Sequence, residues 1–342
     1  MIVQTAWILA AAAVLPAASA PQQEKPAAFP KPSPSSAEEP LARELSLARA
    51  GEFLDGASVN WTREEKCGAC HTNYPYLMAR PLLGKDDPGP AEVRRFFEGR
   101  VAHWDTARPR WDTEVVATAA TLAIHDRLTT GKLHPLTRQA LDRMWTLQRK
   151  NGAWNWLKCN WPPHEHDDYF GAAFAAVGVG LAPDDYAKSE DAKDGLEKLR
   201  GYFRQEPAPN LHHKAWLLWA SCHIEGLMGR EERDAAVQGL LARQRDDGGW
   251  SLGSLGDWKG KDGRRSDPNA PGDGYATGLA VYVLRQAGVS AREEPVRKGA
   301  DWLRRNQRES GRWFTRSLNS DKAHLITHAG TSFAVMALKA CD

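Results

Sequence analysis

Three copies of one turn signal constrain the fold of this chain more than any other feature. They are Gln148-x-x-x-Gly152-x-Trp154, Gln244-x-x-x-Gly248-x-Trp250 and Gln307-x-x-x-Gly311-x-Trp313. In each copy the glycine can end a helix, the glutamine can bond backbone groups at that end, and the tryptophan can pack against the next helices. Because the signal recurs, it predicts a repeat architecture rather than a set of unrelated helices.

The repeat turns separate two kinds of helical pattern. Before Gly152, Leu136, Ala140 and Met144 share one face and the other face is charged, which is typical of a half-exposed helix. Residues 171–181 are small and apolar on every side, which is typical of an enclosed helix. This alternation predicts six helical pairs. No sustained period-two pattern indicates a β-strand. The pairs are 41–54 with 74–83 (after a turn at Trp61), 92–104 with 112–128, 136–147 with 171–181, 191–204 with 211–227, 231–245 with 275–288, and 296–307 with 327–340.

Composition sets the broad class of the protein. With 342 residues, 42% of them hydrophobic and 26% charged, the chain can bury a substantial core. The mean hydropathy of -0.55 is that of an ordinary soluble protein. A formal net charge of +2 shows no excess of basic residues, so we expect no nucleic-acid partner.

The first 40 residues differ from the rest. Residues 1–20 contain an apolar run, a proline and a small-residue Ala18-Ser19-Ala20 site, so they resemble a secretory signal peptide, although no Lys or Arg precedes the run. An apolar N-terminal anchor is the alternative. Residues 21–40 are rich in proline and poor in apolar residues, and we expect a disordered linker there. The mature chain is then exported to the periplasm or beyond, without a membrane-spanning segment.

The repeats, alternating with small-residue apolar helices, resemble the squalene-hopene cyclase and prenyltransferase repeat superfamily over about residues 40–342. The resemblance implies an all-α domain over residues 41–342, a single (α/α)6 toroid of six hairpins with inner helices around a lumen. It also implies an enzyme of the terpenoid cyclase and mutase type, an isomerase that binds and transforms an isoprenoid-like lipid by acid catalysis. The cyclases carry two helical domains at the cytoplasmic membrane, whereas this chain has length for one.

An acidic cluster begins the third enclosed helix. In the cyclases, the proton comes from an Asp-x-Asp-Asp motif, and the similar segment here is Glu165-His166-Asp167-Asp168. The resemblance therefore makes Asp167 the acid, with Glu165, His166 and Asp168 beside it. Such an acid requires a dry site and neighbours that stabilise its conjugate base. The alternative is structural, because aspartates commonly cap helix N-termini.

A second motif, Cys67-Gly68-Ala69-Cys70-His71, fits covalent attachment of a c-type haem. The two thiols would bond the vinyl groups and His71 would be the metal ligand on the iron. The alternatives are half of a zinc site and a Cys67–Cys70 dithiol or disulfide. The distal ligand is left open, with Met78 as one candidate. Cys159, Cys222 and Cys341 can form at most one intramolecular disulfide among them.

The enclosed helices begin with polar residues that an α/α toroid would gather at one mouth. They are His71, Asp112, Asp168, His212, His213, Asp273 and His328. Together they form a better candidate site than any single one, although each can simply cap a helix. Trp216 and Trp219 are candidates to line the lumen, where their faces could stabilise a cation.

Three functions follow from these patterns. The first is an exported cyclase-like protein that acts on a hydrophobic or lipid substrate. The second is a haem-c redox protein with an electron-transfer partner, for which the toroid is a scaffold. The third is a non-catalytic binding domain, because a fold does not fix a function. A zinc-dependent prenyltransferase subunit is disfavoured, because the sequence lacks the corresponding ligand pattern.

Overall fold

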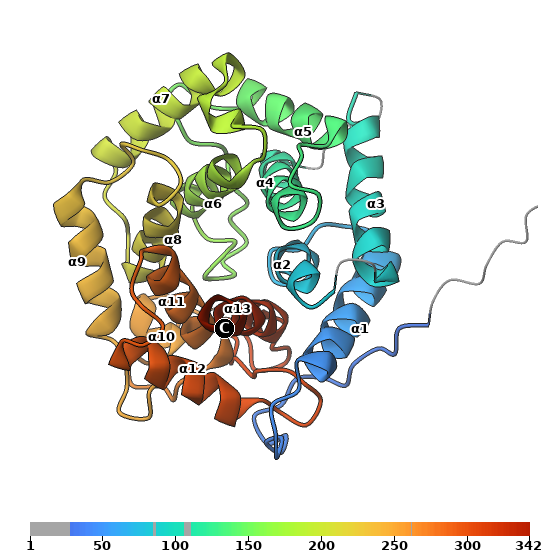
Figure 1. Ribbon diagram of the computed structural model, residues 1–342, viewed down its shortest axis with the longest axis vertical. Coiled ribbons are helices and arrows are strands. Elements are labelled where there is room, and N and C mark those ends of the chain that lie inside the picture. Colours follow the sequence, from blue (N-terminus) through green and yellow to red (C-terminus); the bar gives the residue numbers. More distant parts are fainter. Residues whose placement is uncertain (1–27, 85–86, 106–110, 261) are drawn as a thin grey trace, which may run out of the picture.

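The computed structural model describes residues 28–84, 87–105, 111–260 and 262–342. Figure 1 shows two concentric rings of helices around one axis, which confirms the predicted (α/α)6 toroid. The outer ring consists of α1 (Leu47–Glu65), α3 (Pro88–His103), α5 (Pro135–Thr146), α7 (Glu190–Gln205), α9 (Arg230–Leu241) and α12 (Glu294–Asn306). The inner ring consists of α2 (Asn73–Ala79), α4 (Asp112–Leu128), α6 (Asp168–Leu181), α8 (Leu211–Ser221), α11 (Gly274–Gln286) and α13 (Ile326–Cys341).

The two rings differ in burial as their sequence patterns predict. Every residue of α6 from Tyr169 to Val179 is buried, whereas α12 buries a single face that includes Val296, Ala300 and Leu303. Within the described ranges, extended backbone pairs only at isolated bridges. None of the described helices is long and apolar enough to cross a membrane. The core therefore lies between the rings and around the axis.

The three repeat turns have one common geometry. Gly152, Gly248 and Gly311 have φ angles of 95°, 93° and 93°, where a side chain would be strained. A Cβ on any of them would also lie within 2.7 Å of a backbone carbonyl oxygen of the next outer helix. In every turn the tryptophan Nε1 donates to a carbonyl ten residues earlier at 2.7 Å. Only glycine fits these positions, because the turns dock closely on the neighbouring hairpin.

Each repeat glutamine joins its own turn to the next hairpin, and the third glutamine closes the ring. Gln307 Nε2 donates to Gly311 O at 2.9 Å and to Ser46 O at 2.8 Å, just before α1. Ser46 N donates back to Gln307 Oε1 at 2.7 Å. The first two glutamines make the corresponding bonds to the carbonyls of Gly195 and Pro295. The motif thus fastens successive hairpins together.

The N-terminal segment, residues 28–40, lies against the toroid, which differs from the disorder expected for residues 21–40. Arg312 is 2% exposed, and its guanidinium donates to Ser33 O at 2.7 Å and to Glu39 Oε2 at 2.5 Å. The same guanidinium lies 5.5 Å from the centre of the Phe53 ring. Composition missed this contact because a distant residue supplies it. The expected signal peptide, residues 1–20, lies outside the described residues.

Several helix boundaries differ from the sequence prediction, most clearly those of α1 and α8. Helix α1 begins at Leu47, where Ser46 caps it, and it continues through the expected turn at Trp61 to Glu65. Val59 and Thr62 are buried on its inner face, so packing extends the helix until Lys66 turns left-handed at φ 51°. Helix α8 ends at Ser221 rather than Leu227. A short helix before α11, α10 (Leu252–Leu255), was not expected.

Candidate functional site

Asp167 is the N-cap of α6 and the partner of a buried histidine. Its Oδ1 accepts the Phe170 N–H at 3.0 Å, and its Oδ2 lies 2.9 Å from Nε2 of His213. Burial raises the pKa of Asp167, but His213 and the Phe170 N–H outweigh burial, so its pKa is lowered overall. An ionised carboxylate that is held in this way is poorly suited to donate a proton.

Asp168 and His166 flank this group. Asp168 lies 2.5 Å from Arg149 Nη2 and 2.9 Å from Lys158 Nζ, and it accepts the Trp156 N–H at 3.1 Å. Despite the effect of burial, these contacts lower the pKa of Asp168. His166 is partly exposed, and its charge contributes to the lowered pKa of Asp167. Both aspartates are therefore engaged in a helix cap or in ion pairs.

Glu165 lies in a different environment from the two aspartates. Its backbone pairs with Trp161 in an isolated bridge, whereas its side chain turns to a cavity beside the Cys67–His71 motif. Burial raises the pKa of Glu165. Among the described residues, no hydrogen bond or ion pair engages its carboxyl group. Of the four residues in the predicted cluster, Glu165 is the one whose environment suits a proton donor.

The cavity beside the motif has a volume of about 290 Å³, and we call it the motif cavity. It is lined by Trp61, Cys67, Gly68, Ala69, Cys70, His71, Tyr74, Trp111, Thr113, Glu114, Leu157, Cys159 and Glu165. Asn73 fixes the motif backbone, because its Oδ1 accepts the Ala69 N–H at 2.8 Å and its Nδ2 donates to Cys67 O at 3.0 Å. The tertiary structure thus brings the cysteine motif and Glu165 to one cavity.

A second cavity, of about 590 Å³, lies between the N-terminal segment and the mouth of the toroid. We call it the N-terminal cavity; residues 31–35, Asn60, Trp61, residues 322–325 and His328 are among those lining it. Trp61 borders both cavities. Thr72 also connects them, because its Oγ1 lies 2.7 Å from His71 Nδ1 and 3.0 Å from His328 Nδ1.

A third group of polar side chains lies deeper, at α8 and α11. The Tyr275 hydroxyl is 2.8 Å from Nε2 of His164 and 2.8 Å from Nε2 of His212. Burial lowers the pKa of His164 to about 3, and that of His212 is also lowered, so both rings are neutral. Sequence reasoning missed His164 and Tyr275, and only the Trp-Pro-Pro sequence before His164 marked an unusual loop.

The predicted mouth residues are therefore divided into separate groups. His71 and His328 meet through Thr72, whereas Asp167 pairs with His213. Asp273 caps α11 and accepts from Leu252 N, Ala276 N and Thr315 Oγ1, although burial raises its pKa to about 6. Asp112 begins α4 without a side-chain cap bond. The predicted polar residues therefore form several separate hydrogen-bond networks rather than one shared site at the mouth of the toroid.

The axis of the toroid near this mouth is filled by aromatic rings. Trp216 lies 5.1 Å from Phe170 and 5.7 Å from Phe333 between ring centres, and Phe333 lies 5.3 Å from Tyr275. Trp219 is fully buried and makes an edge contact with Tyr282. Trp216 and Trp219, which were candidates to line a lumen, thus pack against other side chains in the core.

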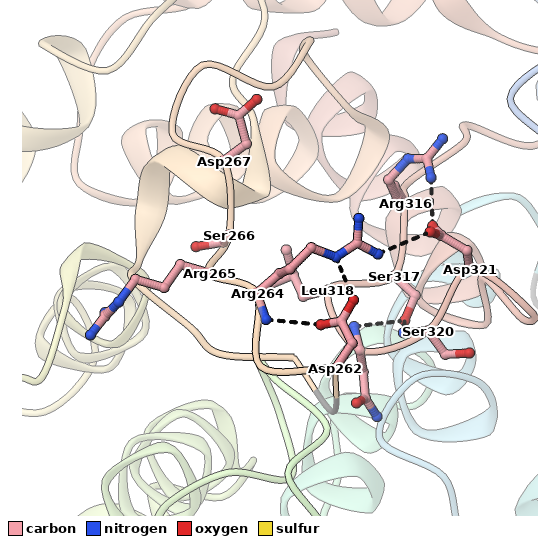
Figure 2. A pocket seen from close by; sticks show the side chains of 11 residues that line it. Asp262, Arg264, Arg265, Ser266, Asp267, Arg316, Ser317, Leu318, Ser320 and Asp321 are labelled. Carbon is pink, nitrogen blue, oxygen red and sulfur yellow. Dashed lines mark hydrogen bonds and ion pairs between the residues drawn. The ribbon is translucent and has the colours of Figure 1, made fainter.

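A charged hollow of about 230 Å³ lies between residues 262–267 and 316–321. Figure 2 shows Arg316 and Arg264 directed toward Asp321, and Arg264 also directed toward Asp262. Arg265 points away from them and pairs with Asp257. Among the described residues that line the hollow, each arginine has an acidic partner, so these arginines offer no unbalanced positive charge to an anion.

All five cysteines are thiols, so no disulfide joins Cys159, Cys222 and Cys341. Across the described ranges, no group of three or more His, Cys, Asp or Glu side chains is arranged to hold a metal ion. The zinc alternative therefore lacks a ligand set there. Met78 is buried in the core and does not border the motif cavity.

Comparisons with known proteins support the fold alone. No family model matches the chain, and no curated protein matches it. The GH76A alpha-1,6-mannanase from Salegentibacter sp. HEL1_6 is similar in structure, with a TM-score of 0.53 and 10% identity over 86% of this chain and 98% of that one. A possible GH105 member from Klebsiella pneumoniae has a TM-score of 0.48 and 13% identity, over 78% and 80% of the two chains.

A type II terpene cyclase, a variant of MstE from Scytonema in complex with geranylgeranyl dihydroxybenzoate, has a TM-score of 0.47 and 13% identity. That match covers 79% of this chain and 87% of the cyclase chain. At 10% identity, the likeness to the mannanase supports the α/α toroid fold alone and leaves substrate and activity to be argued from the site.

Proposed function

We propose that this protein carries a covalently attached c-type haem in the motif cavity and works in electron transfer or redox chemistry, with the toroid as its scaffold. The observation that carries the proposal is that Cys67, Cys70 and His71 all border one cavity with aromatic walls. Thioether bonds to the two thiols and ligation by the adjacent histidine are what this motif offers a haem.

The state of His71 fits a metal ligand. Burial lowers the pKa of His71 to about 4, so the ring is neutral. Its Nδ1 lies 2.7 Å from Thr72 Oγ1, which leaves Nε2 for an iron ion. Metal-ligating histidines usually have a hydrogen bond at the other ring nitrogen, which fixes the orientation of the ring. Trp61 adds an edge contact to the ring at 5.0 Å.

The haem would supply one-electron transfer at its iron. The chain would hold and surround it: Cys67 and Cys70 would fix its position, His71 would orient it, and Trp61 and Tyr74 would exclude water from that wall. Cys159 and Glu165 also border the cavity, so either could provide a second ligand to the iron. Met78 does not border it. We also propose that the protein is exported to the periplasm or beyond, because c-type haem is assembled outside the cytoplasm.

The test is expression in a bacterial periplasm with the haem-attachment machinery. We expect a haem that stays with the chain after denaturation and acid-acetone extraction, read by absorption and by intact mass. Cys67→Ala with Cys70→Ala should lose it, whereas Cys222→Ala, a thiol outside the cavity, should keep it. A colourless wild-type chain without added haem mass would refute the proposal.

A second candidate is acid-catalysed transformation of an isoprenoid-like lipid. The observation that favours it is Glu165, a carboxyl group with a raised pKa in a cavity with Trp61, Tyr74 and Trp111. A protonated carboxyl can donate to an alkene, and aromatic faces can stabilise the resulting cation. The toroidal fold is compatible with this chemistry, and a hydrophobic substrate would suit the aromatic walls.

The second candidate is tested with squalene and shorter polyprenyl substrates, with products detected by mass spectrometry. A product that forms with the haem-free wild type and not with Glu165→Gln would support it. If the wild type converts none of these substrates and still attaches haem, the redox function stands alone.

A further inference from the structure

Two histidines that are far apart in the sequence meet at one threonine hydroxyl. His71 Nδ1 and His328 Nδ1 lie 2.7 Å and 3.0 Å from Thr72 Oγ1. Thr72 is fully buried, and its side chain makes no cap bond at the start of α2. The hydroxyl therefore bridges the two rings instead of stabilising the helix end.

The remaining ring nitrogens belong to two different cavities. His71 borders the motif cavity and His328 borders the N-terminal cavity. In the part of the chain that the structure describes, neither Nε2 atom has a hydrogen-bond partner. Edge contacts with Trp61 and Phe53, at 5.0 Å and 5.6 Å, hold the two rings. Each Nε2 is thus a polar atom without a protein partner on a ring that borders a cavity.

The bridge restricts where the protons can be. A hydroxyl has one proton, so Thr72 can donate to one ring and must accept from the other. Among the described residues no carboxylate pairs with either ring, and the single bridging hydroxyl can donate to only one of them, so the geometry is that of two neutral rings. A neutral imidazole carries its proton on one nitrogen only. The two rings must therefore adopt opposite tautomers.

Two arrangements satisfy this condition. In the first, His71 Nδ1 donates to Thr72 and Thr72 donates to His328 Nδ1, so Nε2 is bare on His71 and protonated on His328. In the second, both bonds reverse, and Nε2 is protonated on His71 and bare on His328. Only the first arrangement lets His71 bind a metal ion or accept a proton from the motif cavity.

We infer that Thr72 couples the two cavities, and that a hydrogen-bond acceptor bound at His328 in the N-terminal cavity selects the His71 tautomer with a bare Nε2. A carboxylate or carbonyl oxygen is such an acceptor. Lys31 and Lys322 border this cavity together with Glu64 and Glu65, and Lys31 pairs with Glu64, so the hydrogen bond from His328 rather than net charge would hold the acceptor. Its volume of about 590 Å³ is within the range of small-molecule sites. The coupling does not require haem, and only its effect on an iron ligand rests on the proposed function.

The test uses the haem-free chain with ¹⁵N-labelled histidine and long-range proton–nitrogen NMR, which distinguishes the tautomers. Thr72→Val removes the hydroxyl at similar size, and Thr72→Ser keeps it as the matched control. Acetate is the probe, with chloride at equal ionic strength as its control. In the wild type and Thr72→Ser, we expect opposite tautomers and an acetate-induced shift of His71 toward bare Nε2, by about fivefold for one net hydrogen bond.

In Thr72→Val, we expect acetate to leave the tautomer ratio of His71 unchanged. Equal tautomers in the wild type, or the same His71 shift in Thr72→Val, would overturn the inference. In the haem-loaded chain, Thr72→Val should shift the reduction potential relative to Thr72→Ser. A chain that never attaches haem refutes the proposed function, and the NMR result still decides the coupling.

Discussion

The N-termini of α6 and α2 lie in the same inner ring and differ in how completely their polar groups are satisfied. At α6, Asp167 caps the helix and pairs with His213, and Asp168 is held by Arg149 and Lys158. At α2, the Nε2 of His71 borders a cavity, and the carboxyl of Glu165 reaches the same cavity from the loop before α6. Acidic residues that resemble a catalytic motif can thus be structural, while chemistry is expected where a polar group still lacks a partner.

The largest expected effect comes from removing Asp167 at the N-terminus of α6, where the polar groups are satisfied. Asp167→Ala removes the cap and leaves the buried Nε2 of His213 without its carboxylate partner, so we expect the free energy of unfolding to fall by about 3 kcal/mol. Asp167→Asn is the matched control, because it keeps the cap and loses only the charge. Urea unfolding measures both variants. A loss below about 1 kcal/mol for Asp167→Ala would show that the His213 contact contributes little.

The next largest effect concerns Glu165, whose carboxyl group borders the motif cavity. If a lipid product is detected, Glu165→Gln should reduce turnover at least about a hundredfold, because it removes the proton donor and keeps its shape. Asp167→Asn should retain most of the activity once its stability is corrected for. Product formation by mass spectrometry measures both. If Asp167→Asn lost turnover and Glu165→Gln kept it, Asp167 rather than Glu165 would be the acid.

The contributions of Asp167 and Glu165 to the free energy of unfolding should change with pH in opposite directions. The folded pKa of Asp167 is lowered, so its contribution is present above its unfolded pKa of about 3.9 and is lost as pH falls through the folded value. The folded pKa of Glu165 is raised, so its contribution is present below about 4.3 and is lost as pH rises through the folded value.

Stability measured from pH 3 to 7 therefore sharpens the comparison. Relative to the wild type, Glu165→Gln should gain stability as pH rises above about 4, whereas Asp167→Asn should lose stability as pH rises toward about 4 and stay level above it. Parallel curves for the two variants would contradict the assignment of opposite environments.

The smallest effect concerns Asp168. Arg149 and Lys158 are 41% and 54% exposed in their side chains, so solvent weakens these pairs. We expect Asp168→Asn to cost about 1 kcal/mol or less in thermal or urea unfolding. Because Asn keeps an acceptor for the Trp156 N–H, a larger loss would indicate that the two ion pairs contribute more than their exposure suggests.

Much of the fold could be predicted, because its determinants are local. Gly152, with its φ angle of 95°, forms the repeat turn after α5 through contacts within that turn, and the all-apolar pattern of 171–181 requires enclosure. The length of α1 could not be predicted, since burial of Val59 against other helices extends it past Trp61. The seating of residues 28–40 could not be predicted either, since Arg312 provides the contact from across the chain.

The sequence by itself determined the six helical pairs and the presence of the Cys67–His71 motif, because helix periodicity and turn chemistry act over a few residues. The closure of the pairs into a toroid was implied by the family resemblance. Only the tertiary structure decided which polar groups are satisfied. Asp167 and Glu165 are two residues apart, yet one contacts His213 from α8 and the other borders a cavity beside Cys70. The pKa of a carboxyl depends on neighbours and burial in space, and the sequence does not state which distant residues provide them.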